Sequence, residues 1–403
     1  MLLLKNIKEL IGIDQNIFDY QRLVKLEDAW LLIEGEKIAA FGSMNNALPE
    51  AQEVIDVAQG SVLPAWCDSH THLVFAGSRE NEFVDRIKGL SYEEIAERGG
   101  GILNSAKKLA DTSFEDLYHS AKKKLKQLAS LGTGLVEIKS GYGLSVEAEL
   151  KILRVAQALK EDSLVEIKTT FLGAHAIPMA YRSDRRGYLD LIIKEMLPTI
   201  AKEGLADYID VFCEKVAFSP DETDEILKAG LEFGLKPKIH TNQFNSMGGI
   251  EVAIANGAIS VDHLEVLNDE EIRKLSNSNV IPTLLPSAPF FLGDAFPPAR
   301  KMIAAGLQPA LASDYNPGSS PSYNMNLVIS LACIKMKMSP EEAINAATIM
   351  GAKALEMEAD YGSIKRGKMA NLIVTEPIPS VNYLPYHFGE APISSIFLKG
   401  KLI

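Results

Sequence analysis

The chain has 403 residues, of which 47% are hydrophobic and 23% charged, which is the balance of an ordinary globular protein with room for one large domain and a smaller one. Its net charge of −12 and its pI near 5.2 argue against general binding to nucleic acid or an anionic membrane, because most of the surface would repel both. The three cysteines (67, 213 and 333) form no Cys-x-x-Cys pair, so neither a disulfide framework nor a four-thiolate zinc site is supported.

No targeting or membrane-spanning segment is expected. Only three apolar residues follow Met1 before Lys5 interrupts them, which is too short for the core of a signal peptide. No apolar run elsewhere approaches the length of about 20 residues that a membrane span needs. With cysteines that suit reducing conditions, the chain is predicted to be cytoplasmic, with neither nucleic acid nor membrane as a partner.

The N-terminal 60 residues predict short strands, and the middle of the chain predicts a repeated strand–helix pattern. Residues 29–43 and 53–60 are strand-like segments broken at glycines. Eight apolar or β-branched runs, each ending in a polar cluster, are the predicted strands of the middle region: 61–72, 133–143, 165–175, 206–215, 235–243, 258–265, 279–288 and 307–318. Amphipathic stretches between them are the predicted helices: 113–132, 145–162, 188–204, 219–234, 248–257, 268–277 and 297–306.

Several of these helices carry recognisable ends. Ser113 and Ser219 are predicted N-caps, each with an acidic residue three positions on, Asp116 and Glu222. Four helices are predicted to stop at glycine, at positions 132, 204, 234 and 257. Eight strand–helix repeats of this kind predict a closed (β/α)8 barrel of the TIM type.

After the last predicted barrel strand the chain returns to short strands. A long helical stretch, 323–357, precedes strand-like segments at 362–376 and 393–403. Because both ends are rich in strands, we expect them to pair with each other. The predicted organisation is an α/β fold, with the barrel at 61–358 and a small composite β-sandwich domain built from 1–60 and 359–403.

Two histidines lie one residue apart at the end of the first predicted barrel strand, in "PAWCDSHTH". Side chains alternate between the faces of a strand, so His70 and His72 point the same way. At the C-terminal rim of a barrel, two such imidazoles could bind one metal ion as neighbouring ligands. A hydrogen-bonded pair that caps the strand is the structural alternative, and the pair alone does not decide between them.

The other histidines favour the metal. His175, His240 and His263 end the third, fifth and sixth predicted strands, so five of the seven histidines lie at strand ends. Only His119 and His387 do not. Asp314 ends the eighth strand, which in a closed barrel lies beside the first, and a carboxylate is the usual complement of histidine ligands. The sequence therefore predicts a metal centre at the C-terminal rim.

These residues lie in seven motifs that together resemble the amidohydrolase superfamily: "DSHTHLVFAGSRENEF", "RGGGI", "EIKSGYGL", "FLGAHAIP", "HTNQFNSMGG", "VDHLE" and "ASDYNPGS". The resemblance covers essentially the whole chain. It implies a (β/α)8 barrel with a small β-sandwich built from both termini. It also implies one Zn or Fe ion, bound by His70, His72, His240 and Asp314, as in the mononuclear branch of the superfamily.

A second metal ion is the alternative on this point. Binuclear members carry a carboxylated lysine at the end of strand four. Here Lys215 lies beyond that position in the predicted register, which favours one ion. Lys139 and Lys168 also lie on predicted strands, so a different register would allow a binuclear site.

Within the superfamily, the motifs are similar to those of enzymes that open the ring of 4-imidazolone-5-propanoate to N-formimidoyl-L-glutamate in histidine degradation. The resemblance implies attack by a metal-activated water, with Asp314 as the proton shuttle. His263, off the metal, would stabilise or protonate the developing oxyanion.

The implied substrate is a small anion, which an acidic protein must bind with a local cation. Arg79 is the candidate to grip its carboxylate, although an isolated arginine is more often a solvated surface residue. Tyr142 lies between glycines, which would let a phenol approach the ligand, but Gly-Tyr-Gly is also an ordinary turn. The residues that the resemblance assigns to substrate binding, besides Arg79, are Tyr142, His175, Gln243, Asn316, Gly318 and Ser319. Gly99–Gly101, with Tyr92 nearby, is the candidate for a closing loop. A homodimer is expected by the same resemblance.

Two other functions remain open at this point. Superfamily members that deaminate aromatic bases often carry a glutamate three residues after the strand-five histidine, where this chain has Gln243, whose amide cannot titrate. An anion clamp at Arg79 would also be idle on a neutral base. A catalytically inactive barrel that acts as a binding protein is the third possibility, but it would have no need of Asp314.

Overall fold

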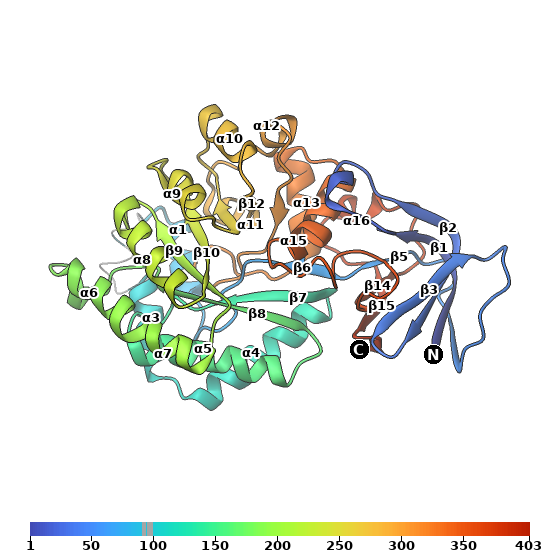
Figure 1. The fold of residues 1–403 in the computed structure, drawn as a ribbon, viewed down its shortest axis with the longest axis horizontal. Helices are drawn as coiled ribbons and strands as arrows, with labels where there is room; N and C mark the ends of the chain where they lie inside the picture. The colour runs from blue at the N-terminus through green and yellow to red at the C-terminus, as the bar shows by residue number, and fades with distance from the viewer. Residues whose placement is uncertain (91–93, 95–99) are drawn as a thin grey trace.

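The structure is a computed structural model that describes residues 1–90, 94 and 100–403. Eight parallel strands form one sheet in chain order, which confirms the predicted barrel (Figure 1). Its strands are β6 (Trp66–Asp68), β7 (Thr133–Lys139), β8 (Glu166–Ala174), β9 (Tyr208–Cys213), β10 (Lys236–Thr241), β11 (Ser260–His263), β12 (Ile281–Leu284) and β13 (Ala310–Leu311).

Helices surround this sheet and follow its strands in the chain. From the first barrel strand to the eighth they are α1 (Glu80–Ile87), α3 (Ile102–Asp111), α4 (Phe114–Ala129), α5 (Val146–Glu161), η2 (Met179–Tyr181), α6 (Arg185–Leu191), η3 (Ile192–Met196), α7 (Leu197–Glu203), α8 (Pro220–Glu232), α9 (Gly249–Ala255), α10 (Asp269–Ser276), α11 (Ser287–Leu292) and α12 (Ala299–Ala304). The long helical stretch after β13 is divided into α13 (Met325–Met336), α14 (Pro340–Asn345), η4 (Ala346–Met350) and α15 (Gly351–Lys353).

The predicted helix ends are largely those observed. Ser113 Oγ accepts a hydrogen bond from Asp116 N, and Ser219 forms a full capping box with Glu222. Both contacts satisfy backbone N–H groups that have no partner within the helix. Gly204 ends α7 with φ of +64°, a conformation that L side chains rarely adopt.

The barrel closes through the residues that follow its first and last strands. Thr71 and Tyr315 form a parallel bridge, Asp314 N donates to His70 O at 3.0 Å, and His72 N donates to Tyr315 O at 2.9 Å. Closure therefore brings the histidine pair of the first strand directly beside the aspartate of the eighth.

The two termini build the second sheet, which lies beside the barrel (Figure 1). Its order is β16-β15-β14-β5-β1-β2-β3, with β4 paired to β1 at one side. The strands are β1 (Leu2–Ile11), β2 (Lys25–Glu34), β3 (Lys37–Ser43), β4 (Glu53–Asp56), β5 (Val62–Pro64), β14 (Leu372–Thr375), β15 (Ile393–Leu398) and β16 (Lys401–Leu402). The short helices η1 (Ile17–Asp19) and α16 (Tyr383–Tyr386) lie in the same terminal segments.

One predicted strand is divided between the two sheets. The sequence 61–72 was expected to be a single barrel strand, but β5 pairs with β1 and β14 in the terminal sheet, and only β6 pairs with β7 in the barrel. The chain passes from one sheet to the other at Ala65. The prediction missed this because both short strands are fully buried, so the apolar pattern runs on without a break.

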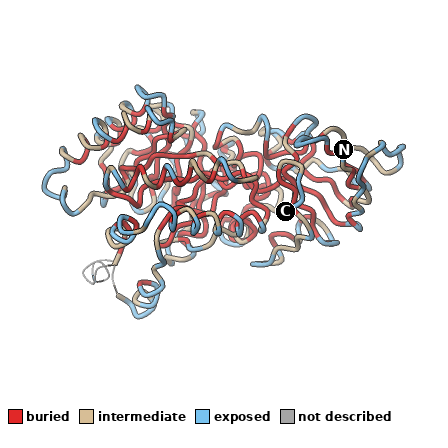
Figure 2. The backbone as a smooth tube through the Cα atoms, turned by 90° about the horizontal axis from the view of Figure 1, so that it is seen from below, coloured by how far each residue is buried: buried red, intermediate tan, exposed pale blue. Residues whose placement is uncertain are grey.

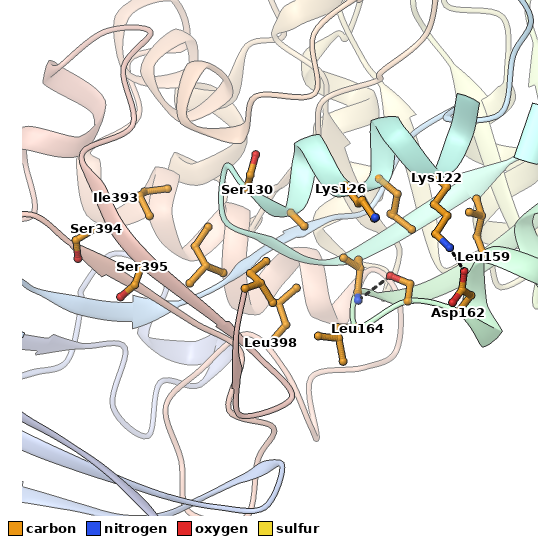
Figure 3. A pocket seen from close by; sticks show the side chains of 16 residues that line it. Lys122, Lys126, Ser130, Leu159, Asp162, Leu164, Ile393, Ser394, Ser395 and Leu398 are labelled. Carbon is orange, nitrogen blue, oxygen red and sulfur yellow. Dashed lines mark hydrogen bonds and ion pairs between the residues drawn. The ribbon is translucent and has the colours of Figure 1, made fainter. Parts of the chain in front are cut away.

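Buried residues run through both parts of the molecule, with exposed segments on the outside (Figure 2). None of the described helices combines the length and apolar character that crossing a membrane needs. A pocket with a volume of about 540 Å³ lies between the α4 and α5 helices and β15, where Lys122 pairs with Asp162 (Figure 3). None of the residues that line this pocket is one of the predicted metal ligands.

Candidate metal centre

The four predicted ligands converge at the C-terminal rim of the barrel, and each is at most 2% exposed. His70 and His72 follow β6, His240 lies near the end of β10, and Asp314 follows β13. Asp314 Oδ1 lies 3.5 Å from His70 Nε2 and 3.8 Å from His72 Nε2. The ring centroids of His70 and His240 are 4.4 Å apart. Among the described residues, His70 belongs to two groups whose possible ligand atoms lie within 4.8 Å of one another, one with His72 and Asp314 and one with His240 and His263.

The nitrogens that face this point suit a metal. The Nε2 atoms of His70 and His240 are buried and have no hydrogen-bond partner among the described residues. Burial lowers the pKa of His70 and of His72 well below the usual value, so their rings are neutral. Neutral imidazole nitrogens and a carboxylate are ligands that zinc and iron both accept. The residues present thus fit a bound ion.

Two aspartates in the barrel interior hold the ligand rings from behind. Asp262 Oδ2 is hydrogen-bonded to His70 Nδ1 at 2.6 Å. Asp210 Oδ2 lies 2.9 Å from His240 Nδ1 without the alignment of a hydrogen bond, and Asp210 Oδ1 accepts from His240 N at 3.1 Å. A carboxylate at Nδ1 favours the tautomer whose lone pair is on Nε2, and it fixes the ring orientation. Both rings therefore present Nε2 to the shared point.

His263 lies beside the ligands with a different electrostatic environment. Its ring centroid is 5.4 Å from that of His240, and its Nδ1 is 3.3 Å from Glu265 Oε1. Burial opposes the charged ring, but the neighbouring Glu265 prevails and raises the pKa of His263 to about 9. His263 can therefore act as a hydrogen-bond donor through both nitrogens.

Asp314 and His263 are held in unusual backbone conformations. The φ angle is +54° at Asp314 and +88° at His263, in a region that side chains other than glycine seldom adopt. Such strain collects at functional sites, where the surrounding structure maintains it. Burial raises the pKa of Asp314 to about 6, which suits a group that must both accept and release a proton.

An aromatic wall lies on one side of the ligands. His175 stacks on His72, with 5.1 Å between ring centroids and an angle of 7° between ring planes. Tyr142 packs edge-on against both rings at 5.4 Å. His175 Nδ1 lies 3.0 Å from Gly141 O, so the backbone of the "SGYG" segment orients the ring. Tyr142 and His175, both predicted substrate contacts, thus border the metal centre.

Arg79 lies near this wall, at the start of α1, with its side chain 10% exposed. Its Nε donates to Ser105 Oγ at 2.9 Å, and its guanidinium carbon is 5.8 Å from the Tyr142 ring centroid. Its Nη2 is buried without a hydrogen-bond partner among the described residues. A Cβ added at Gly318 would come within 2.5 Å of Arg79 Nη1, so the close approach needs glycine there. The solvated surface arginine considered above is therefore wrong.

The remaining predicted substrate contacts differ in whether their polar groups already form hydrogen bonds within the protein. The Asn316 side chain binds its own loop, donating to Asp314 O and accepting from the backbone N–H of Gly318 and Ser319. Ser319 Oγ lies 3.3 Å from Asp314 Oδ2. Gln243 is half-buried just beyond β10. Tyr92 and Gly99 of the candidate closing loop lie outside the described residues.

Comparison with known proteins identifies the family. Residues 61–403 match the amidohydrolase family. A protein of Christiangramia forsetii named imidazolonepropionase is 57% identical over 100% of both chains. A protein of Alkaliphilus metalliredigens with the same name is 41% identical over 96% of this chain and 92% of its own. The chain belongs to the amidohydrolase family, among the imidazolonepropionases. The resemblance seen in its motifs is thereby confirmed.

Solved structures share the amidohydrolase fold at much lower identity. Atrazine chlorohydrolase from Arthrobacter aurescens, complexed with zinc, has a TM-score of 0.73 and 16% identity, over 100% of this chain and 95% of that chain. An adenosine deaminase from Xanthomonas campestris with bound zinc has a TM-score of 0.69 and 16% identity, over 100% and 92%. These likenesses confirm the fold.

The three lysines considered for a binuclear amidohydrolase site are all placed unfavourably for it. Lys215 is exposed beyond β9, and Lys168 pairs with Asp207 at 2.9 Å on the flank of the barrel. Lys139 is fully buried, but its Nζ already contacts Glu137 and Asp210 at 3.1 and 2.8 Å. A carboxylate added to Lys139 would place one more negative charge among these acids, so their contacts favour a single ion.

Sequence reasoning missed the polar residues inside this amidohydrolase barrel. Four charged residues of the barrel strands are at most 1% exposed: Glu137, Asp210, Lys238 and Asp262. Glu137 and Lys238 lie two residues before Lys139 and His240, and the two aspartates lie behind the rings of His240 and His70. A usable signal was present, since "EIK", "KIH" and "SVD" each alternate polar residues along an otherwise apolar strand. This alternation marks the inward face of a polar barrel interior.

Proposed function

We propose that the ion is Zn or Fe, one per chain, and that the metal centre hydrolyses the ring amide of 4-imidazolone-5-propanoate to N-formimidoyl-L-glutamate. The position of His70 carries this proposal, because it lies in one group of possible ligands with His72 and Asp314 and in a second group with His240 at the same rim. The imidazolonepropionase name of a relative at 57% identity supports the substrate.

The reaction adds water to a carbonyl carbon and breaks a C–N bond of the ring. A bound divalent cation would lower the pKa of a water molecule and polarise the carbonyl oxygen. Asp314 accepts a proton from the attacking water and delivers it to the leaving ring nitrogen. His263, which lies beside His240, donates a hydrogen bond to the oxygen on which negative charge develops.

Arg79 binds the propanoate group in this proposal. Its unpartnered Nη2, next to Nη1 beside Gly318, offers the paired donors that match a carboxylate. Tyr142 and His175 form the wall against which the flat ring stacks. Gln243, Gly318 and Ser319 complete the contacts at the rim. Asn316 shapes the loop that carries Asp314, since its amide is occupied by that loop.

Replacing Arg79 with methionine should raise KM for imidazolonepropanoate by about 30-fold or more, because truncating one partner of a buried charge pair removes at least about 2 kcal/mol. Steady-state kinetics measures this. Arg79→Lys should recover part of the loss, since it keeps the charge without the fork. Arg182→Met is the matched control, because it removes an exposed cation from another loop of the same rim. Equal KM changes in the Met variants would contradict the clamp.

Turnover of imidazolonepropanoate by the purified, metal-loaded protein tests the function directly. The expected product is N-formimidoyl-L-glutamate, measured by mass spectrometry, with no ammonia released from guanine or cytosine. The opposite pattern, ammonia from a base and no reaction of the imidazolone, would favour the deaminase. A chain without stoichiometric metal and without activity would favour the binding protein.

The cellular setting is part of the same proposal. Cys67, Cys213 and Cys333 are all free thiols, which supports a reducing cytoplasm. A homodimer is proposed on the resemblance to the family alone, and sedimentation of the purified protein measures it.

A further inference from the structure

The two aspartates behind the ligands share a third partner, Lys139, at the end of β7. Lys139 Nζ lies 2.8 Å from Asp210 Oδ2 and 3.5 Å from Asp262 Oδ2. These are the same oxygens that contact His240 Nδ1 and His70 Nδ1. One ammonium group therefore connects the supports of two ligands that lie 170 residues apart in the chain.

The surroundings of Lys139 leave it little freedom to move. Lys139, Asp210 and Asp262 have side-chain exposures of 0%, and Glu137 Oε1 contacts the ammonium at 3.1 Å. Glu137 is itself held by Lys238 Nζ at 2.9 Å and by the Thr170 hydroxyl. A buried ammonium contacting three carboxylates in this way fixes their positions relative to one another.

The charges also suit a cation above them. In their ordinary ionised forms, Lys139 and Lys238 carry two positive charges, and Glu137, Asp210 and Asp262 carry three negative ones. The network therefore carries one excess negative charge, behind the rings of His70 and His240. This excess favours binding of a metal cation by these rings.

We propose that Lys139 is a positioning residue that sets metal affinity, by holding Asp210 and Asp262 where they orient the rings of His240 and His70. It touches neither the ion nor the substrate. The inference rests on the ligand set of the proposed function and extends it to a residue that the proposed reaction does not use.

A test must separate the positioning of the two aspartates from a change in the net charge of the network. Removing a buried lysine alone would change both, because it leaves the carboxylates unpaired. The double variant Lys139→Met with Glu137→Gln removes one charge of each sign. It keeps the net charge of the network and leaves both aspartates without their ammonium. Lys238→Met with Glu137→Gln is the matched control, since Lys238 is equally buried, pairs with the same Glu137, and contacts neither aspartate in the described ion pairs.

Zinc affinity is measured by competition with a chromogenic chelator on metal-free protein, with the native chain as reference. The double variants are named here by their lysine, as the Lys139 pair and the Lys238 pair. The Lys139 pair is expected to bind zinc about 10- to 100-fold more weakly than the native chain, which is the usual loss when the hydrogen-bonding partner of a metal ligand is removed. The Lys238 pair should stay within about threefold of the native chain. Cobalt-substituted protein should show changed visible bands in the Lys139 pair alone.

Unchanged affinity in the Lys139 pair, or equal losses in both pairs, would overturn the proposal. A Lys139 pair that fails to fold while the Lys238 pair folds would also overturn it, since Lys139 would then act on stability. A native chain that binds no stoichiometric zinc would refute the ligand set itself, and the native reference reveals that outcome separately.

Discussion

Replacing Asp314 with asparagine should lower kcat for imidazolonepropanoate by about 10²- to 10⁴-fold, the range that general acid–base catalysis contributes. Asparagine keeps the size of the side chain, but its amide cannot accept a proton from water and release it to the leaving nitrogen. Because Oδ1 lies within 3.5 Å of His70 Nε2, the variant should also bind metal more weakly. Kinetics at saturating metal separates the two effects.

Asp68→Asn is the matched control for this experiment. Asp68 ends β6, is fully buried, and binds Ser313 through both oxygens, at 2.9 Å to the backbone N and 2.6 Å to Oγ. Its removal perturbs the same region without removing a proton carrier. Its kcat should stay within about tenfold of native. An Asp314→Asn enzyme as active as native would refute the shuttle.

Stripping the metal with a chelator should abolish turnover by at least about 10³-fold and lower the melting temperature. Without the ion, the buried Nε2 atoms of His70 and His240 have no partner, and burying an unpaired polar group carries a penalty of about 1–3 kcal/mol. A bound ion adds further stability, about 4 kcal/mol at a thousand times its Kd. Calorimetric melting and activity are measured on the same samples.

Zinc and ferrous iron should each be tried for restoring activity and melting temperature. Magnesium is the control, because it prefers oxygen ligands in octahedral geometry and should restore neither. Full activity in protein shown by elemental analysis to hold less than about a tenth of an ion per chain would contradict a metal-dependent reaction.

The gathering of five histidines and Asp314 at one rim could be predicted from the sequence, because each lies at the end of a strand of one repeating pattern. The choice of His70, His72, His240 and Asp314 as ligands came from the resemblance to the amidohydrolase superfamily, and it stays a prediction. Parallel strands in a barrel deliver their C-terminal ends to one rim, so His240 and Asp314 could be placed beside His70 without knowing any distance. The contacts between the rings of the predicted ligands and the buried aspartates could not be predicted. Asp262 meets His70 across 192 residues of chain, and no local pattern states which inward residue faces which.

The strand boundaries could not be predicted from the sequence either. β13 has two residues and β12 has four, whereas the predicted segments were 12 and 10 residues long. In a closed barrel a strand needs few ladder bonds, since helices bury its outer face, so apolar character extends past the paired residues. Part of the predicted seventh strand is instead the start of α11, where Ser287–Leu292 turns into a helix.

The contact between the first and last barrel strands has a consequence for folding during synthesis. β6 and β13 are joined by backbone contacts of His70, His72, Asp314 and their neighbours, and the two sides of this contact lie about 245 positions apart in the chain. With the proposed ligands, the last strand must therefore be synthesised and docked before all four can surround one ion. An ion captured earlier could contact only the proposed histidine ligands, so the proposed site would be completed only when the barrel closes.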